Sequence, residues 1–200
     1  MIGAALIRRG RYLEYFTVGY SSLEGLVAVG AGLIAGSIAL IGFGVDSFIE
    51  IISGVTLIWR LRADLDEERR ERVEEISLRL VGVCLIVLAL YVIKDSVWSL
   101  FKHEAPDENL IGIMLAAVSF IVMPLLVRAK RRVARSINSV ALMADSKQTE
   151  LCTYLSAILL GGLLLNVLLG WWWADPVAAL IMVPIIAKEG LEALRGGNLL

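Results

Sequence analysis

The fold of this chain is decided by residues 36–59, which read GSIALIGFGVDSFIEIISGVTLIW. The stretch is long enough to cross a bilayer as a helix, yet it carries two carboxylates, Asp46 and Glu50, near its middle. Two acids four residues apart lie one turn apart on the same helix face. An ionisable residue at such a depth is costly and normally faces the interior of a helix bundle, often on an ion pathway. We therefore predict that Asp46 and Glu50 form half of a cation site.

The composition of the whole chain is typical of a polytopic membrane protein. Of its 200 residues, 58% are hydrophobic, whereas soluble domains are usually about 45–50% apolar. The net charge of −1 indicates no nucleic-acid partner. Both cysteines, Cys84 and Cys152, fall inside apolar segments, which argues against a secreted disulfide framework. The first apolar stretch continues into a full span without a small-residue cleavage site, so we interpret it as a helix and not as a signal peptide.

The apolar blocks predict an all-α membrane protein, with one domain over residues 1–200 and no soluble domain. Six transmembrane helices are expected at about residues 12–33, 37–59, 76–100, 110–127, 140–170 and 176–194. The short loops on one side carry most of the Lys and Arg, namely Arg8, Arg9, Arg11, Arg60, Arg62, Arg69, Arg70, Arg72, Arg128, Lys130, Arg131, Arg132 and Arg135. The positive-inside rule then places both termini in the cytoplasm, in a multi-pass protein of the plasma (cell inner) membrane.

A second group of polar residues falls in the fifth expected span. It consists of Asp145, Gln148, Thr149 and Cys152, whose offsets put them on one helix face. At about 1.5 Å per residue, Asp46 and Glu50 lie roughly 13–20 Å from one membrane surface, and Gln148 and Cys152 roughly 12–18 Å from the other. In a core of about 30 Å these levels coincide, so two carboxylates, an amide oxygen and a thiolate can meet. Four such ligands suit tetrahedral Zn²⁺, and the sulfur favours zinc or a softer metal over Mg²⁺ or Ca²⁺.

Each of these residues also has a simpler interpretation. Asp46 and Glu50 could form a structural polar network without an ion. Gln148 could join helices by hydrogen bonds, and Cys152 could be a small packing residue.

Three further acids in the apolar segments have more than one interpretation. Glu24, in the first span, could bind metal, serve a proton or ion-access pathway, or cap a packing network. Asp145 lies near the cytoplasmic interface, where pathway lining, solvation and helix packing all fit. Glu150 points away from the face that carries Gln148 and Cys152, so a neighbouring helix or a second copy of the chain has to satisfy it.

Three segments resemble the cation diffusion facilitator (cation efflux) family. Residues 36–50 resemble its second helix, residues 141–152 its fifth, and residues 173–179 the start of its sixth, while Glu24 stands where members often have an acid. The resemblance covers nearly the whole chain and implies a homodimeric exporter of divalent metals, usually zinc, driven by proton exchange. It also implies a transport site at four positions, Asp46, Glu50, Gln148 and Cys152.

Two departures from the family pattern affect these expectations. The family normally has His or Asp, then Asp, where this chain has Gln148 and Cys152, so proton exchange falls on Asp46 and Glu50, helped by Glu24 or Asp145. The chain also resembles the short six-helix branch that lacks the cytoplasmic domain. Its dimer contact is then expected within the membrane, at the small-residue patches 25–36 and 161–162.

The sequence therefore predicts a secondary transporter that exports Zn²⁺ or a similar divalent cation by alternating access around a midplane site. The metal is cargo and no prosthetic group is expected; the partners are the lipid bilayer and a second copy of the chain. An enzyme is not expected, because a His-Glu-x-x-His motif is missing and the single histidine lies in a loop. The alternative is a non-transporting membrane interaction protein on a degenerate transporter fold.

Overall fold

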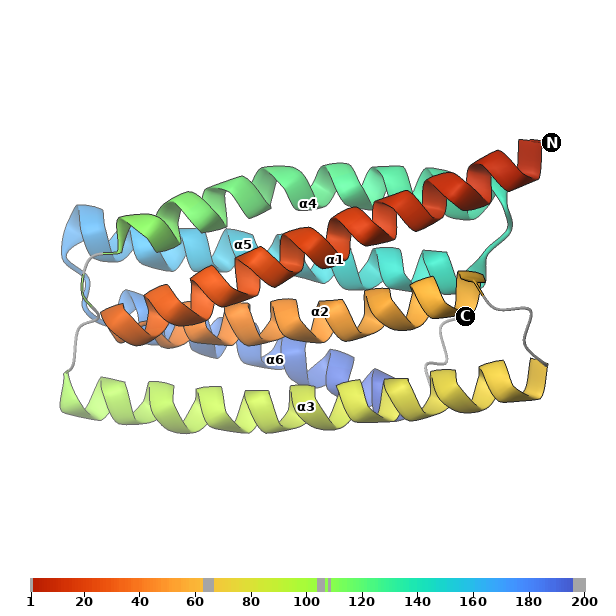
Figure 1. The fold of residues 1–200 in the computed structure, drawn as a ribbon. Helices are drawn as coiled ribbons and strands as arrows, with labels where there is room; N and C mark the ends of the chain where they lie inside the picture. The colour runs from red at the N-terminus through yellow and green to blue at the C-terminus, as the bar shows by residue number, and fades with distance from the viewer. Residues whose placement is uncertain (1, 63–66, 104–106, 108, 196–200) are drawn as a thin grey trace.

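The computed structural model describes residues 2–62, 67–103, 107 and 109–195, and over these residues it contains helices and no strand (Figure 1). The helices are α1 (Ile2–Ala35), α2 (Ile38–Arg62), α3 (Glu67–Lys102), α4 (Leu110–Ser136), α5 (Val140–Leu169) and α6 (Ala174–Leu194). The predicted all-α class and six-helix count are confirmed.

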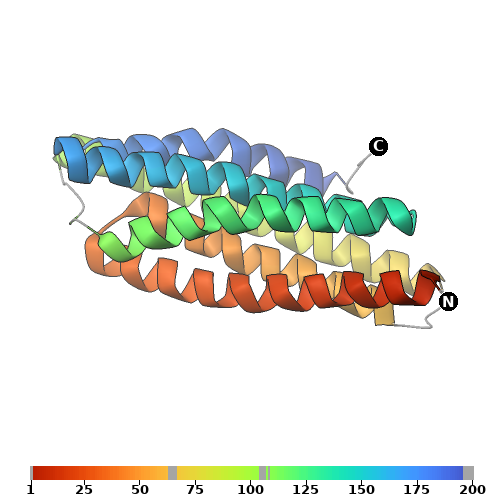
Figure 2. The same ribbon diagram turned by 90° about the horizontal axis from the view of Figure 1, so that it is seen from above.

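The six helices run alternately up and down one bundle, so α1 begins and α6 ends at the same end (Figures 1 and 2). We call this the basic end, because Arg8 and Arg11 of α1 and Arg131, Arg132 and Arg135 of α4 lie toward it. Trp171–Trp173 connect α5 to α6 at the opposite end, which we call the aromatic end. The cytoplasmic location of the basic end stays a prediction.

Local signals account for several helix ends. Gly36 has φ +68°, a left-handed conformation that glycine adopts without steric cost, and it ends α1 before the turn into α2. Asn109 caps α4 by accepting from the N–H of Gly112 at 2.9 Å. Ser139 accepts from the N–H of Leu142 at 3.3 Å and caps α5 in the same way. Gly170, with φ +65°, ends α5.

The distribution of polarity is that of a membrane bundle. Large apolar side chains such as Ile34, Leu90 and Leu168 are exposed on the outside, whereas acids and hydroxyls are buried within. Five helices, α1 to α5, are long and apolar enough to span a bilayer. The sixth, α6, has 21 residues and packs against α3 and α5.

Some glycines of the predicted small-residue patches already lie at close contacts between helices of the same chain. A Cβ at Gly25 would lie 3.1 Å from the carbonyl oxygen of Gly44, so Gly25 is used between α1 and α2. A Cβ at Gly162 would lie 2.6 Å from the Cβ of Ala178, so Gly162 is used between α5 and α6. Gly30 and Gly161 have open space around them. The dimer contact stays a prediction, but Gly25 and Gly162 already have partners within one chain.

The fourth helix differs from its predicted extent in a way that matters for the site. The basic residues after 127 were expected in a loop, yet α4 continues to Ser136. Its cationic segment therefore keeps helical spacing, and Lys130 falls on the same face as the buried Met123 and Val127. The prediction that Lys130 lies in a loop is wrong, because this residue is part of α4, and its side chain is 0% exposed.

Candidate metal centre

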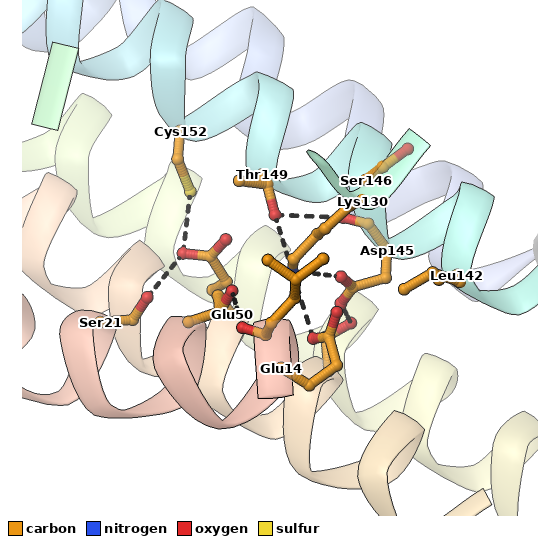
Figure 3. A network of polar contacts seen from close by, with 12 residues as sticks. Glu14, Ser21, Glu50, Lys130, Leu142, Asp145, Ser146, Thr149 and Cys152 are labelled. Atoms are coloured by element: carbon orange, nitrogen blue, oxygen red, sulfur yellow. Dashed lines mark hydrogen bonds and ion pairs between the residues drawn. The ribbon is translucent and has the colours of Figure 1, made fainter. Parts of the chain in front are cut away.

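The centre of the bundle contains the two carboxylates of α2. Asp46 and Glu50 are 1% and 0% exposed, and their one-turn spacing turns both toward α5. The thiol of Cys152 on α5 donates to Asp46 Oδ2 at 3.3 Å and to Glu50 Oε2 at 3.5 Å. Ser21 of α1 donates to the same Glu50 oxygen at 2.8 Å. Figure 3 shows Cys152 and Ser21 approaching the Glu50 carboxylate from two helices.

The spacing of these groups suits a tetrahedral metal ion. An oxygen about 2.1 Å and a sulfur about 2.3 Å from zinc are roughly 3.6 Å apart at the tetrahedral angle. The two sulfur–oxygen distances of 3.3 and 3.5 Å are close to that value. Asp46 Oδ1 and Glu50 Oε1 are buried without a hydrogen-bond partner, which is the state expected of oxygens that have a further ligand to bind.

The candidate ligand atoms do not yet converge on one position that an ion could occupy. Within the described part of the chain, no three His, Cys, Asp or Glu side chains are already arranged as the ligands of one ion. A bound cation would therefore require Asp46, Glu50 and Cys152 to rotate toward it.

The fourth predicted ligand, Gln148, differs from the other three. It lies one turn before Cys152 on α5 but is only half-buried. Its Nε2 atom is buried without a hydrogen-bond partner. Because this nitrogen has no partner, Gln148 donates no hydrogen bond to Asp46 or Glu50, whereas Cys152 and Ser21 do. The structure thus brings three of the four predicted residues together.

Glu24 lies beside this group in a hydrogen-bond network of its own. It accepts from Ser47 Oγ at 3.0 Å and from Ser119 Oγ, and Tyr20 contacts the same Ser119 hydroxyl at 2.8 Å. These bonds tie α1 to α2 and α4. The contacts agree with the packing network weighed for Glu24, while its proton or ion-access role stays a prediction.

Asp145, the other acid considered for a pathway, is 5% exposed and has two kinds of partner. It forms an ion pair with Lys130 of α4 and accepts from Ser53 Oγ of α2 at 3.2 Å. Lys130 also contacts Glu14 Oε2 of α1 at 3.2 Å and Thr149 Oγ1 at 3.1 Å. Asp145 is therefore buried in a charged cluster and is not solvated at the membrane surface.

Glu14 and Lys130 were missed as buried charges, although the sequence contained a signal for each. Glu14, Thr17, Ser21 and Glu24 follow a spacing of three, four and three, and all are buried on one face of α1. Lys130 continues the buried face of α4, which becomes visible only once that helix is extended beyond residue 127. Glu150 has a partner inside the chain, since Arg131 of α4 contacts its Oε2 at 2.6 Å.

Asp175, at the start of α6, holds the aromatic end of α2 in place. It is 1% exposed and accepts from Ser37 Oγ and from the backbone N–H of Ile38 at 3.0 Å and of Ala39 at 3.4 Å. A carboxylate at this position satisfies the free N–H groups of a helix start and complements its dipole. It thereby fixes the helix that carries Asp46 and Glu50.

A buried acidic pair on the second helix, joined by a residue of the fifth, agrees with the family resemblance. The model of the cation efflux transmembrane domain matches residues 18–197. The chain belongs to the cation efflux family. Members of this family are multi-pass membrane proteins and transporters rather than enzymes, which agrees with the expected location in the cell inner membrane.

Three relatives within the cation efflux family illustrate its range. Magnetosome protein MamB of Paramagnetospirillum magneticum is 29% identical over 82% of this chain and 57% of its own length. Cation-efflux pump FieF of Shewanella oneidensis is 24% identical over 81% and 56%. Manganese efflux system protein MneP of Bacillus subtilis is 21% identical over 82% and 59%. The chain thus spans less than two thirds of the length of each of these relatives.

Proposed function

We propose that this chain moves a divalent transition-metal cation, with Zn²⁺ as the first candidate, across the membrane. The observation that carries the proposal is the contact of one thiol with two buried carboxylates, at 3.3 Å to Asp46 and 3.5 Å to Glu50. In the middle of a bilayer, two adjacent acids are costly unless they serve an ion. The sulfur donor favours zinc or a softer cation over Mg²⁺ and Ca²⁺.

The proposed coordination shell is Asp46, Glu50 and Cys152, with Gln148 as the fourth ligand. Because Gln148 Nε2 has no hydrogen-bond partner, reorienting the amide to present its oxygen breaks no bond of that nitrogen. The oxygens without partners on Asp46 and Glu50 are available in the same way. The ion would draw these four side chains together.

The proposed energy source is proton exchange at the same carboxylates. A metal ion binds the deprotonated form of its ligands, so protons and metal compete for Asp46 and Glu50. Acid on one side of the membrane then favours release of the metal on that side. The two α2 carboxylates would face the two sides in turn, and a second copy of the chain completes the proposed assembly.

The test is metal flux in proteoliposomes with and without a pH gradient. Unmodified protein is compared with Asp46→Asn, and Glu192→Gln serves as the control because this acid lies on the exposed surface of α6. We expect saturable zinc flux that rises with the gradient, persists in the control and is lost in Asp46→Asn. Cadmium, iron and manganese are measured in parallel, and flux of one of these alone would keep the site and change the cargo. No flux of any metal from folded protein would refute the proposal and favour the non-transporting alternative.

A further inference from the structure

A buried ammonium group lies on the basic-end side of the candidate metal centre. Lys130 is 0% exposed, and its Nζ contacts Glu14 Oε2 at 3.2 Å, Asp145 Oδ2, and Thr149 Oγ1 at 3.1 Å. In Figure 3 its side chain reaches from α4 into the space between Glu14 and Asp145. The three partners come from α1 and α5, so one cation joins three helices.

The same layer also includes the second helix. Ser53 of α2 donates to Asp145 Oδ1 at 3.2 Å. A Cβ at Gly54 would lie 3.6 Å from Glu14 Oε2, so the Glu14 carboxylate lies against the backbone of α2. We call Glu14, Lys130, Asp145, Thr149 and Ser53 the lysine layer. It connects the four helices α1, α2, α4 and α5.

The lysine layer is adjacent to the metal centre along every helix that they share. Ser53 is three residues beyond Glu50 on α2, and Thr149 is three residues before Cys152 on α5, so each is about one turn away. Glu14 is two turns before Ser21 on α1. An ion that travels between the basic end and the metal centre within these four helices therefore has to pass the lysine layer.

Physical chemistry gives the lysine layer two properties. Removing one partner from a buried ion pair leaves an uncompensated charge, so breaking the contacts of Lys130 while its partners stay buried is strongly destabilising. A cation that approaches from the basic end meets Glu14 and Asp145, and both are already occupied by Lys130. The approaching ion can use these carboxylates only if the ammonium leaves them.

We propose that Lys130 is a tethered cation that closes the path running between α1, α2, α4 and α5 from the basic end to the metal centre, and that it must leave Glu14 and Asp145 before an ion can pass along this path. This inference rests on the proposed function only for the identity of the ion that passes. The closure itself is a property of the lysine layer. Lys130 is a positioning residue in this scheme and does not bind the transported metal. Without its ammonium, Glu14 and Asp145 repel each other and the layer opens.

Cys152 provides a native probe for this opening. Right-side-out and inside-out membrane vesicles containing the full chain are treated with a membrane-impermeant, cationic methanethiosulfonate reagent, and modification of each cysteine is followed by peptide mass spectrometry. Cys84 on α3 is the internal reference. The vesicle orientation exposing the basic end is identified by protease cleavage after Arg135, which is exposed. We expect Lys130→Met to raise the rate of Cys152 modification from the basic end at least tenfold.

Two control variants separate gate opening from general loosening. Lys130→Arg keeps the positive charge and is expected to stay close to the unmodified rate. Arg131→Gln removes the neighbouring α4–α5 ion pair, in which Arg131 is 31% and Glu150 34% exposed, and is expected to have no effect. If Lys130→Met fails to give a single folded species, Glu14→Gln takes its place, with a several-fold rise expected.

The inference is overturned by any of three results. These are a change of less than twofold in Lys130→Met or its substitute, an equal rise in Arg131→Gln, and an equal rise from both membrane faces. The assay uses no metal, so its failure is distinguishable from that of the proposed function. Absence of metal flux together with the expected modification rates would refute the proposed function and support the closure.

Discussion

Replacing Cys152 with alanine tests whether the thiol is a metal ligand or a packing residue. The side chain is 0% exposed and packs with Met123 and Leu126. This environment fits a metal ligand and a packing residue equally well. The two interpretations differ in what happens to metal affinity. If Cys152 is a packing residue, its replacement leaves the metal ligands unchanged. If Cys152 is a ligand, its replacement removes part of the free energy of metal binding.

The expected loss follows from the composition of the site. Four-ligand structural zinc sites contribute about 10–16 kcal/mol, which is about 2.5–4 kcal/mol for each ligand. Each 1.4 kcal/mol is a factor of ten in affinity, so losing the thiolate weakens zinc binding roughly 100- to 1000-fold. Manganese, which prefers oxygen ligands, loses less affinity than zinc or cadmium.

The assay is calorimetric titration of purified protein in lipid nanodiscs with Zn²⁺, Cd²⁺ and Mn²⁺ at neutral pH. Cys84→Ala is the matched control, since Cys84 is the other free cysteine and contacts the α3 side of the core. Cys152→Asp is expected to recover binding with a shift toward manganese. Zinc affinity in Cys152→Ala within threefold of that in Cys84→Ala would refute the ligand assignment. An equal loss for all three metals would show that alanine deforms the site without removing a sulfur ligand.

Three further predictions concern the supports of the site and its pH dependence. Asp175→Ala leaves the start of α2 without its cap and is expected to lower the free energy of unfolding by about 2–4 kcal/mol, measured by SDS titration; an unchanged midpoint would contradict it. Gly162→Ala is expected to destabilise by about 1–3 kcal/mol, because its Cβ would meet Ala178 at 2.6 Å. The neighbouring Gly161→Ala, in open space, should be neutral or stabilise by up to about 1 kcal/mol, and equal effects would refute the assigned α5–α6 contact. Zinc binding should weaken on acidification, because protons compete with the metal for the carboxylates of α2, and pH-independent binding between pH 5 and 8 would exclude this competition.

Local patterns in the sequence were sufficient for the class of fold and for placing Asp46 and Glu50 on one helix face. Apolar blocks of bilayer length predict membrane helices because each helix satisfies its own backbone hydrogen bonds in lipid. Asp46 and Glu50 share a face by helical spacing alone, so their association needs no tertiary information. The order of the segments and their resemblance to the cation efflux family agree with the match over residues 18–197.

Helix extents near charged segments were harder to predict. Hydropathy ends α4 near residue 127, whereas the hydrogen-bonded helix continues to Ser136. A stretch rich in Arg and Lys looks like a loop when only polarity is considered. Its helical spacing, which puts Lys130 in line with Val127 and Ala134, carried the missing information.

By itself, the sequence determined which residues are apolar, which are ionisable and how each helix distributes them around its axis. Only the tertiary structure decided which faces meet. It brings the thiol of Cys152 within hydrogen-bonding distance of Asp46 and Glu50, and it pairs Lys130 with Glu14 across 116 positions in the chain. The physical reason is that the rotation and depth of each helix are set by packing against its neighbours, including close crossings such as Gly162 against Ala178. The sequence of one helix does not specify which helices pack against it. A pairing between charges that are distant in the chain is therefore seen only in the assembled bundle.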